Sequence, residues 1–406
     1  MDNITHSLAG LAVGELLQRT LRPEAEVATQ STRRRMLLVS CAAANNFPDL
    51  DLLLRGRLPA PLDYLLDHRG HTHTLLYALP QALLIAALVW LLWPAARRLL
   101  RTSGPARGGL ALAVGLGLCM HIGMDFLNSY GVHPFYPLDA RWFYGDALFI
   151  VEPVMWMAFG APLAMMLPRR WMRMVAALLF ALVLAASLGG GFLASGSVLA
   201  LAAGAAALAW LQRGAALAGR GAIGAGVLLA VGFAGAQLMM SAHAKRLIEV
   251  HLLRLNPATR VLDIAMTPLP SNPLCWTFVT LEHAAGTPSY RLRRGMYSAA
   301  PALAGLGACP AALSMRNLSG TSQAGVGWQA EFQVAQLKAL AATCRGNAWL
   351  RFARMPVLWP DTATDARFST EGANFTTLAL GKPDLSPCPP GIPQWGMPRA
   401  DLVQGK

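Results

Sequence analysis

Histidine and aspartate side chains gather in four short pieces within the first third of the chain. Six of the nine histidines precede residue 134, in a region otherwise poor in polar residues. Imidazole and carboxylate groups are the ligands that a borderline divalent ion takes, and zinc accepts both. The four pieces therefore predict a metal site; they are Thr5-His6-Ser7, Pro48-Asp49-Leu50-Asp51, His68-Arg69-Gly70-His71-Thr72-His73-Thr74, and His121 with Asp125.

His121 and Asp125 carry the strongest local signal. They stand four residues apart near the end of an apolar stretch, so both project from one face of a helix. An ionisable pair inside a membrane segment is costly and by default marks a functional site. The alternative is a His–Asp hydrogen bond that only braces the helix. We favour metal ligands.

The histidine-rich run predicts further ligands. The spacings of His68, His71 and His73 let two of the three share a face, on a helix or on an extended strand. We take all three as candidate ligands, with a supporting role open for His73; the alternative is a loop anchored among lipid headgroups. His6 joins this set only if the topology brings it to the same side, since a lone histidine near a terminus usually lies on the surface.

Asp49 and Asp51 follow Pro48, where a helix is expected to end because proline disfavours helix in the residue before it. Two carboxylates there would serve solubility alone if no histidines were near. Because the histidines are expected nearby, we predict catalytic roles for both Asp49 and Asp51. Asp49 is a ligand or bridges two ions, and either carboxylate is suited to take a proton from water.

Four further residues are candidate substrate contacts: Arg69, His133, Arg141 and Glu152. The two arginines are suited to hold an anionic group such as a phosphate, although arginines at a membrane surface also meet lipid headgroups. His243, His251 and His283 have no partner pattern, and we assign them no role.

The composition is that of a membrane protein. Of 406 residues, 54% are hydrophobic and 14% charged, and the mean hydropathy is +0.41; soluble domains average about 25% charged residues. The net charge is +13. The arginines lie in short clusters between apolar runs, which is typical of cytoplasmic loops. The net positive charge therefore indicates the membrane topology, and we expect lipids rather than nucleic acid as the partner.

The apolar runs predict a membrane all-α helical bundle with a small C-terminal β-rich domain. Two short helices are expected at 4–18 and 36–47, joined by an arginine-bearing linker. Longer runs of about the length that spans a bilayer follow at 75–93, 110–127, 148–167, 171–190, 195–212 and 222–241. The predicted divisions are a metal-site domain (1–155), further transmembrane helices (156–241), the β-rich domain (242–381) and an irregular Pro/Gly-rich tail (382–406).

The arginines also predict orientation. Alternating spans place linkers 19–35, 94–109, 168–173 and 213–220, which hold most of these arginines, on one side, and positive loops stay in the cytoplasm. The opposite side, with Arg55, Arg57, Arg69 and Arg141, receives all four His/Asp pieces. We therefore expect the site on the periplasmic side of a bacterial inner membrane. Asp2, His6 and Glu15 precede the first arginine, so we expect no cleaved signal peptide.

Residues 254–380 alternate polar and apolar side chains between Pro and Gly punctuation, which predicts strands. The alternation of spans puts this domain outside, although Lys245, Arg246 and Arg254 mildly favour the cytoplasm. An oxidising compartment would allow two disulfides among Cys275, Cys309, Cys344 and Cys388, in any of three pairings.

The four pieces resemble the YdjM-like family of inner-membrane-bound metal-dependent hydrolases, and Asn272-Pro273-Leu274-Cys275-Trp276 resembles the Asn-Pro-x-x-Trp of longer members. The order of ligands is also distantly similar to zinc-dependent phospholipase C. Those enzymes add an HxxxE helix; here Glu152 has Leu148 four residues before it, so one or two metal ions are expected rather than three.

These observations lead to the hypothesis of a membrane-bound hydrolase that uses a divalent metal, zinc by preference, on a lipid or lipid-linked phosphoester. A metal or haem transporter or sensor is a different hypothesis. The runs 171–190, 195–212 and 222–241 hold only Arg173 as a charged residue, which argues against a conduction path. A membrane scaffold with a structural metal is a third.

Overall fold

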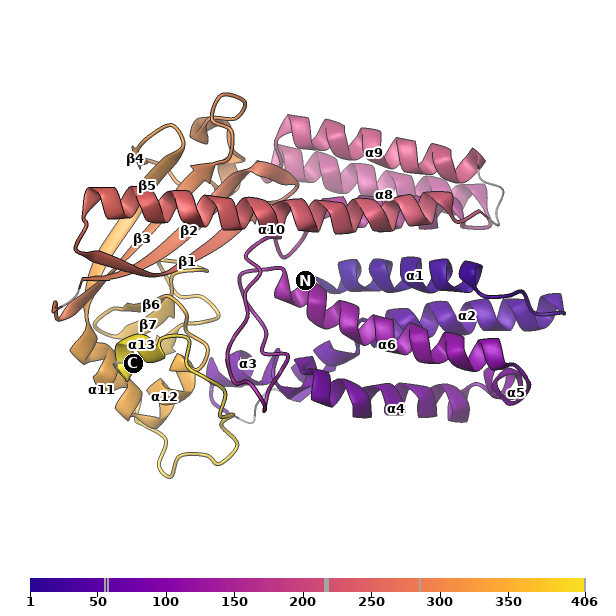
Figure 1. The fold of residues 1–406 in the computed structure, drawn as a ribbon, viewed down its shortest axis with the longest axis horizontal. Helices are drawn as coiled ribbons and strands as arrows, with labels where there is room; N and C mark the ends of the chain where they lie inside the picture. Colours follow the sequence, from indigo (N-terminus) through magenta and orange to yellow (C-terminus); the bar gives the residue numbers. More distant parts are fainter. Residues whose placement is uncertain (55, 57, 215–218, 285, 405–406) are drawn as a thin grey trace.

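The structure is a computed structural model that describes residues 1–54, 56, 58–214, 219–284 and 286–404. Helices lie side by side in one part of the molecule, and a sheet domain stands at one end of them (Figure 1). The predicted fold class is confirmed: a helical membrane bundle with a C-terminal antiparallel sheet domain.

The first two helices form an antiparallel pair, α1 (Asn3–Thr20) and α2 (Val27–Ala44). The prediction that α2 begins at residue 36 is wrong, because the helix extends back through the arginines expected in a linker. Their charges are compensated locally. Arg33 is buried and donates to Gln18, Glu24 and the carbonyl of Arg22, and Glu15 pairs with Arg19 and Arg34.

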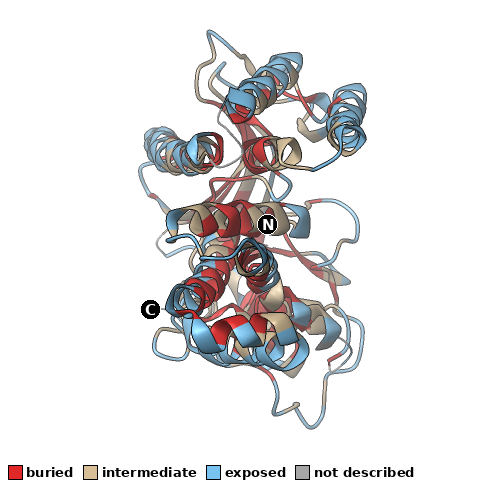
Figure 2. Cartoon of the chain, turned by 90° about the vertical axis from the view of Figure 1, so that its right-hand side faces the viewer, coloured by how far each residue is buried: buried red, intermediate tan, exposed pale blue. Residues whose placement is uncertain are grey.

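Five helices in the described part of the chain are long and apolar enough to cross a membrane: α4 (Leu75–Leu92), α6 (Gly104–Phe126), α8 (Arg170–Gly189), α9 (Ser195–Gly214) and α10 (Gly221–Leu255). The run predicted at 148–167 forms only α7 (Pro153–Met165), which is shorter. Seen along the bundle, exposed residues cover the outward surfaces of the helices (Figure 2). Apolar side chains such as Leu178 and Leu199 are more than half exposed there, as lipid contact requires.

The arginine-bearing connections gather at the end of the bundle opposite the sheet domain. The α1–α2 connection and α5 (Pro94–Thr102) lie at that end (Figure 1). Arg19 contacts the carbonyl of Gly219 and the sulfur of Met166, so the connections before α8 and α10 are there too. Arg55 and Arg57, expected on the opposite side, lie outside the described residues.

The C-terminal domain begins directly after α10, which continues past the span predicted to end at residue 241. An antiparallel sheet has the order β1-β2-β3-β5-β4, and a second, three-stranded sheet has the order β6-β7-β8. The strands are β1 (Thr259–Leu269), β2 (Asn272–Ala284), β3 (Ser289–Ser298), β4 (Ser319–Gly320), β5 (Ala324–Gln333), β6 (Pro356–Leu358), β7 (Thr362–Asp365) and β8 (Leu378–Ala379). The sequence did not predict the helices of this domain, α11 (Val334–Ala342), α12 (Cys344–Leu350) and α13 (Ala400–Val403), or the short 3-10 turns Leu306–Ala308 and Ala311–Leu313.

Two disulfides join Cys275 to Cys309 and Cys344 to Cys388, one of the three pairings that the sequence allowed. Cys41 and Cys119 are free.

Buried ion pairs dock the sheet domain onto the loop between α6 and α7. Arg354 donates to both oxygens of Asp146, at 2.9 and 3.0 Å, and also pairs with Asp263 of β1. Arg367 donates to the carbonyl oxygens of Ser129 and Tyr130. A core cluster that includes Tyr130, Phe352 and Trp395 is continuous across this junction. The sheet domain therefore lies directly beside the end of the bundle where the His/Asp pieces are expected.

Candidate metal centre

Close helix contacts bring the first, second and fourth His/Asp pieces together. A Cβ at Gly10 would lie 2.6 Å from the Cα of Ala42, and one at Gly117 would lie 2.7 Å from the carbonyl oxygen of Cys41. Glycine at these positions lets α1 and α6 pack directly on the backbone of α2. His6 on α1 and His121 on α6 consequently stack, with ring centroids 4.1 Å apart.

The two remaining pieces are short 3-10 segments. In η1 (Phe47–Leu54), Asp49 and Asp51 are buried while Leu50 between them is 48% exposed. In η2 (His71–His73), which follows α3 (Leu62–Asp67), His73 is fully buried and points toward α6. These tight turns separate the side chains that face the centre from those that face away.

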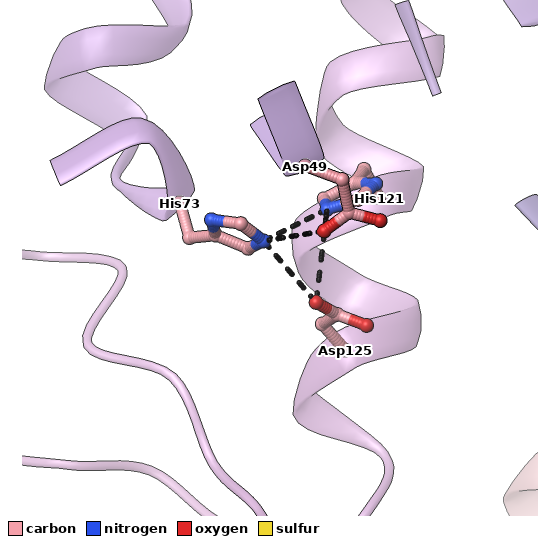
Figure 3. Close-up of side chains that lie close together, drawn as sticks. All are labelled: Asp49, His73, His121 and Asp125. Atoms are coloured by element: carbon pink, nitrogen blue, oxygen red, sulfur yellow. Dashed lines mark hydrogen bonds and ion pairs between the residues drawn. The ribbon is translucent and has the colours of Figure 1, made fainter. Parts of the chain in front are cut away.

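Asp49, His73, His121 and Asp125 form a buried cluster whose ligand-type atoms all lie within 4.8 Å of one another (Figure 3). The Nε2 atoms of His73 and His121 are 2.9 Å apart. Asp49 Oδ1 lies 3.5 and 3.6 Å from these two nitrogens, and Asp125 Oδ2 lies 3.3 and 3.6 Å from them. Ligands about 2.05 Å from a tetrahedral zinc ion are about 3.3 Å apart, so the cluster has dimensions that fit one ion.

The surrounding hydrogen bonds direct two lone pairs into this cluster. His121 Nδ1 lies 2.9 Å from the carbonyl oxygen of Asn45, an acceptor, so Nδ1 carries the hydrogen. His73 Nδ1 lies 3.3 Å from Asp51 Oδ2. In neutral histidines both Nε2 atoms are then acceptors that face each other and two carboxylate oxygens. Two imidazole nitrogens and two carboxylate oxygens that converge in this way are a donor set that fits a metal ion.

The electrostatics of the 3-10 segments point the same way. Burial lowers the pKa of His73, but its contacts with Asp125, Asp49 and Asp51 outweigh burial and raise it to about 10. Burial would raise the pKa of Asp51, yet the contacts with His68 and His73 lower it to about 2. The pKa of Asp49 is also lowered, because contacts with His121 and His73 outweigh burial. The negative charge of these carboxylates favours a cation at their centre, either a protonated His73 or a bound metal ion.

Arg69, His6 and the amino group of Met1 hold Asp125 from its other side. Arg69 lies 3.0 Å from each carboxylate oxygen of Asp125, donates to Asn128 and stacks over the Tyr130 ring. His6 Nε2 is 3.3 Å from Asp125 Oδ1, and the Met1 amino group contacts the same atom. Arg69, predicted to bind substrate, is buried and engaged with Asp125, so it positions this carboxylate. The sequence alone gave no sign of that pairing.

Asp49, Asp51 and His68 form a second, adjoining group with ligand-type atoms close together. His68 Nδ1 lies 3.1 Å from Asp51 Oδ1 and 4.0 Å from Asp49 Oδ1. Asp51 also accepts hydrogen bonds from Thr72 Oγ1 and the amide of Arg69. The side chain of His68 is 11% exposed, more than the buried members of the first cluster, so this group forms the more open side of the centre.

The remaining predicted residues lie away from both groups. His71 contacts the rings of Tyr77, Tyr136 and Trp395 instead. His133 is buried between Trp142 and Trp395, and burial lowers its pKa to about 3.

Arg141 is 78% exposed and pairs with Asp139. Glu152 caps α7 and accepts hydrogen bonds from the amide and hydroxyl of Ser271, which ties α7 to the β1–β2 turn. Burial raises the pKa of Glu152 to about 7.

The helices and the buried cluster define a multi-span membrane protein with a centre that could hold a metal ion. Residues 1–196 match the family model described as YdjM inner membrane protein, so this part of the chain is similar to that family. The matched residues include every member of both His/Asp groups. The resemblance to zinc-dependent phospholipase C finds no support in these comparisons.

The chain is also similar to a protein of Bacillus subtilis (strain 168) described as "Uncharacterized protein YfhP". The two are 28% identical over 142 residues, which cover 35% of this chain and 39% of YfhP. No solved structure matches the chain.

Proposed function

We propose that this protein is a membrane-bound, metal-dependent hydrolase. The observation that carries the proposal is the meeting of two imidazole lone pairs and two carboxylate oxygens in one buried cluster. Asp49, His73, His121 and Asp125 would hold the ion, with zinc preferred because the set mixes imidazole with carboxylate. A divalent ion bound there would lower the pKa of coordinated water and polarise the bond to be cleaved.

The second group supplies the acid–base chemistry of the proposal. His68 and Asp51 form a hydrogen-bonded imidazole–carboxylate pair on the open side of the cluster. Such a pair can accept a proton from an attacking water and deliver it to the leaving oxygen. Asp49 belongs to both groups and is suited to bridge them if a second ion occupies the His68 side.

A lipid or lipid-linked phosphoester is the proposed substrate class. The centre is built where the spans end: Asp125 is next to the last residue of α6, and His73 lies two residues before α4 begins. A site at the ends of spans lies at the depth of lipid headgroups. Exposed apolar residues on the same segments, Ile4 and Leu50, are suited to contact lipid beside it.

The proposed side is the periplasm. The arginine-bearing connections lie at the other end of the bundle (Figure 1), and positive loops stay in the cytoplasm. The C-terminal domain, next to the centre, contains two disulfides, which persist in oxidising compartments.

Metal analysis combined with a hydrolysis assay tests the proposal. Protein purified in detergent is assayed for bound zinc and other divalent ions, and for hydrolysis of phosphate monoesters, phosphodiesters and phospholipid vesicles. We expect at least one ion per wild-type chain, hydrolysis that a chelator removes and zinc restores, and loss of both ion and activity in His121→Ala. His243→Ala, at an exposed position on α10, is the matched control.

A wild-type protein without bound ion, or hydrolysis equal in wild type and His121→Ala, would overturn the proposal. Bound ion without hydrolysis of any tested ester, and unfolding on metal removal, would favour a structural metal in a scaffold.

A further inference from the structure

A cavity of about 590 Å³ lies in the C-terminal domain, between helices α11 and α12 and the second sheet. Its walls are largely apolar, with Leu340, Leu358, Trp359 and Leu378 among them, and two cationic side chains, Arg345 and Lys382, also line it. Sites for small molecules have this size and this mixture of apolar wall and few polar groups.

Arg345 differs from every other buried arginine in the described part of the chain. Five of them form an ion pair with a carboxylate within 4 Å; these are Arg33, Arg69, Arg354, Arg367 and Arg399. Arg345 is only 6% exposed, yet among the described residues it has no carboxylate within that distance, and its Nε has no hydrogen-bond partner. Burying an unpaired guanidinium is costly, so this side chain lacks an anionic partner.

Asp384 lines the same cavity, and its charge interacts with Arg345 at longer range, but it forms no ion pair with the guanidinium within 4 Å. Its two carboxylate oxygens accept hydrogen bonds from the backbone amides of Cys344 and Arg345, at 2.8 and 2.9 Å. Within the described part of the chain, the guanidinium donates one hydrogen bond, from Nη1 to the carbonyl oxygen of Pro383 at 3.5 Å. The cavity therefore keeps a surplus of positive charge, and the disulfide between Cys344 and Cys388 holds its two edges together.

We propose that this cavity binds an anionic amphiphile, a molecule with a carboxylate or phosphate monoester head and an apolar chain. The head would pair with Arg345 and Lys382, and the chain would lie against Leu340, Leu358 and Trp359. Arginine forms two parallel hydrogen bonds with either head group. The site is separate from the His/Asp centre and does not depend on hydrolase activity.

Photo-crosslinking of the full-length protein in lipid nanodiscs tests this site. The probes are a ten-carbon alkyl carboxylate and a ten-carbon alkyl phosphate, each with a diazirine in the chain, and the competitors are unlabelled decanoate, decyl phosphate and decanol. We expect labelling within residues 336–346 and 378–384, competition by an anionic compound and none by decanol. The more effective of the two anions identifies the head group.

Charge-removing variants give the second measurement. Arg345→Gln should reduce labelling of these peptides at least about tenfold, since each tenfold corresponds to about 1.4 kcal/mol, and Lys382→Gln should reduce it severalfold. Lys338→Gln, on the exposed side of α11 and outside the cavity lining, should not change it. Because Arg345→Gln alters a buried position, Lys382→Gln and decanol competition decide the matter if it misfolds. Equal competition by decanol, or equal labelling of Lys382→Gln and Lys338→Gln, would overturn the proposal.

Discussion

His73 Nδ1 lies 3.3 Å from Asp51 Oδ2, on the side of the imidazole ring opposite to His121. Asp51 is itself held by Thr72 Oγ1 at 2.8 Å and by the amide of Arg69 at 3.0 Å. This chain of contacts fixes the orientation of His73 and favours the tautomer whose Nε2 is free to bind an ion. Residues that bind no ion themselves thus determine the geometry of the cluster.

Thr72→Val should weaken metal binding without unfolding the protein. The variant keeps the shape of the side chain but removes the hydroxyl that donates to Asp51, so His73 loses part of its support. Outer hydrogen bonds of this kind typically change metal affinity by about 10–100-fold. Titration with a competing chelator measures the shift. Thr102→Val, at an exposed helix end, is the control, and equal affinity in both variants would contradict this role for Thr72.

His71→Ala and His73→Ala should differ in metal content although the two residues are neighbours. His73 lies in the cluster, whereas His71 contacts Tyr77, Tyr136 and Trp395. We expect His73→Ala to lose the ion. His71→Ala should keep it and lose only packing, about 0.5–1.5 kcal/mol for an aromatic contact. Metal content and thermal unfolding of both variants check this. Loss of the ion from His71→Ala would show that His71, contrary to the structure, helps to bind the ion.

Much of the centre could be predicted from the sequence because its signals are local. The spacing of His121 and Asp125 gives one helix face, and the arginine clusters indicate which helix ends gather. Which residues of His68-Arg69-Gly70-His71-Thr72-His73 face the cluster could not be predicted. It depends on a 3-10 turn after Gly70, where a Cβ would lie 2.8 Å from the carbonyl oxygen of Asp67.

Contacts between residues far apart in the chain could not be predicted from the sequence either. The partner of Arg69 is 56 residues away at Asp125, and the partner of Glu152 is Ser271 in another domain. The beginning of α2 could not be predicted because its three arginines resemble a linker. In the structure Arg33 pairs with Glu24, and Arg34 pairs with Glu15. In the C-terminal domain, the strand pattern was visible, but the helices that form the cavity were not.

Thiol labelling should find two reactive cysteines in the denatured, unreduced protein. Cys41 and Cys119 are free, while the other four cysteines form disulfides. Mass spectrometry after maleimide treatment in denaturant should show two adducts, and six after reduction. Six adducts before reduction would mean that the C-terminal domain folds in a reducing compartment, which contradicts the proposed periplasmic side.

Arg354→Met should loosen the docking of the sheet domain. Its guanidinium pairs with Asp146 of the α6–α7 loop and Asp263 of β1, and Asp146 is fully buried. Without Arg354, buried Asp146 keeps Lys245 as an ion-pair partner, at 2.6 Å. The cost is therefore smaller than the cost of about 3–5 kcal/mol for a buried charge left with no partner. Limited proteolysis should then cut the chain faster between the bundle and the sheet domain. Arg291→Met removes an exposed pair with Glu331 and should change the rate little.

Glu152 should make the protein less stable as the pH rises toward neutrality. Burial raises its pKa from 4.5 to about 7, so the folded state binds the proton more tightly than the unfolded state. The protonated carboxyl of Glu152 therefore contributes fully to the free energy of unfolding below about pH 4.5. This contribution, about 3 kcal/mol in total, is lost as the pH rises to about 7, and above that pH the carboxyl causes no further change. Oε1 accepts from the amide of Val154 and from the amide and hydroxyl of Ser271, and Oε2 also accepts from the Ser271 amide, at 3.2 Å.

Glu152→Gln imitates the protonated acid and should remove this part of the pH dependence. Thermal unfolding measured from pH 5 to pH 8 should show a smaller decline in the variant than in the wild type, with the difference concentrated below pH 7. Glu249→Gln, at an exposed position on α10, should leave the wild-type slope unchanged. Parallel curves for wild type and Glu152→Gln would mean that the carboxyl of Glu152 ionises freely in the folded protein, and that its contact with Ser271 does not couple proton binding to the junction between the two domains.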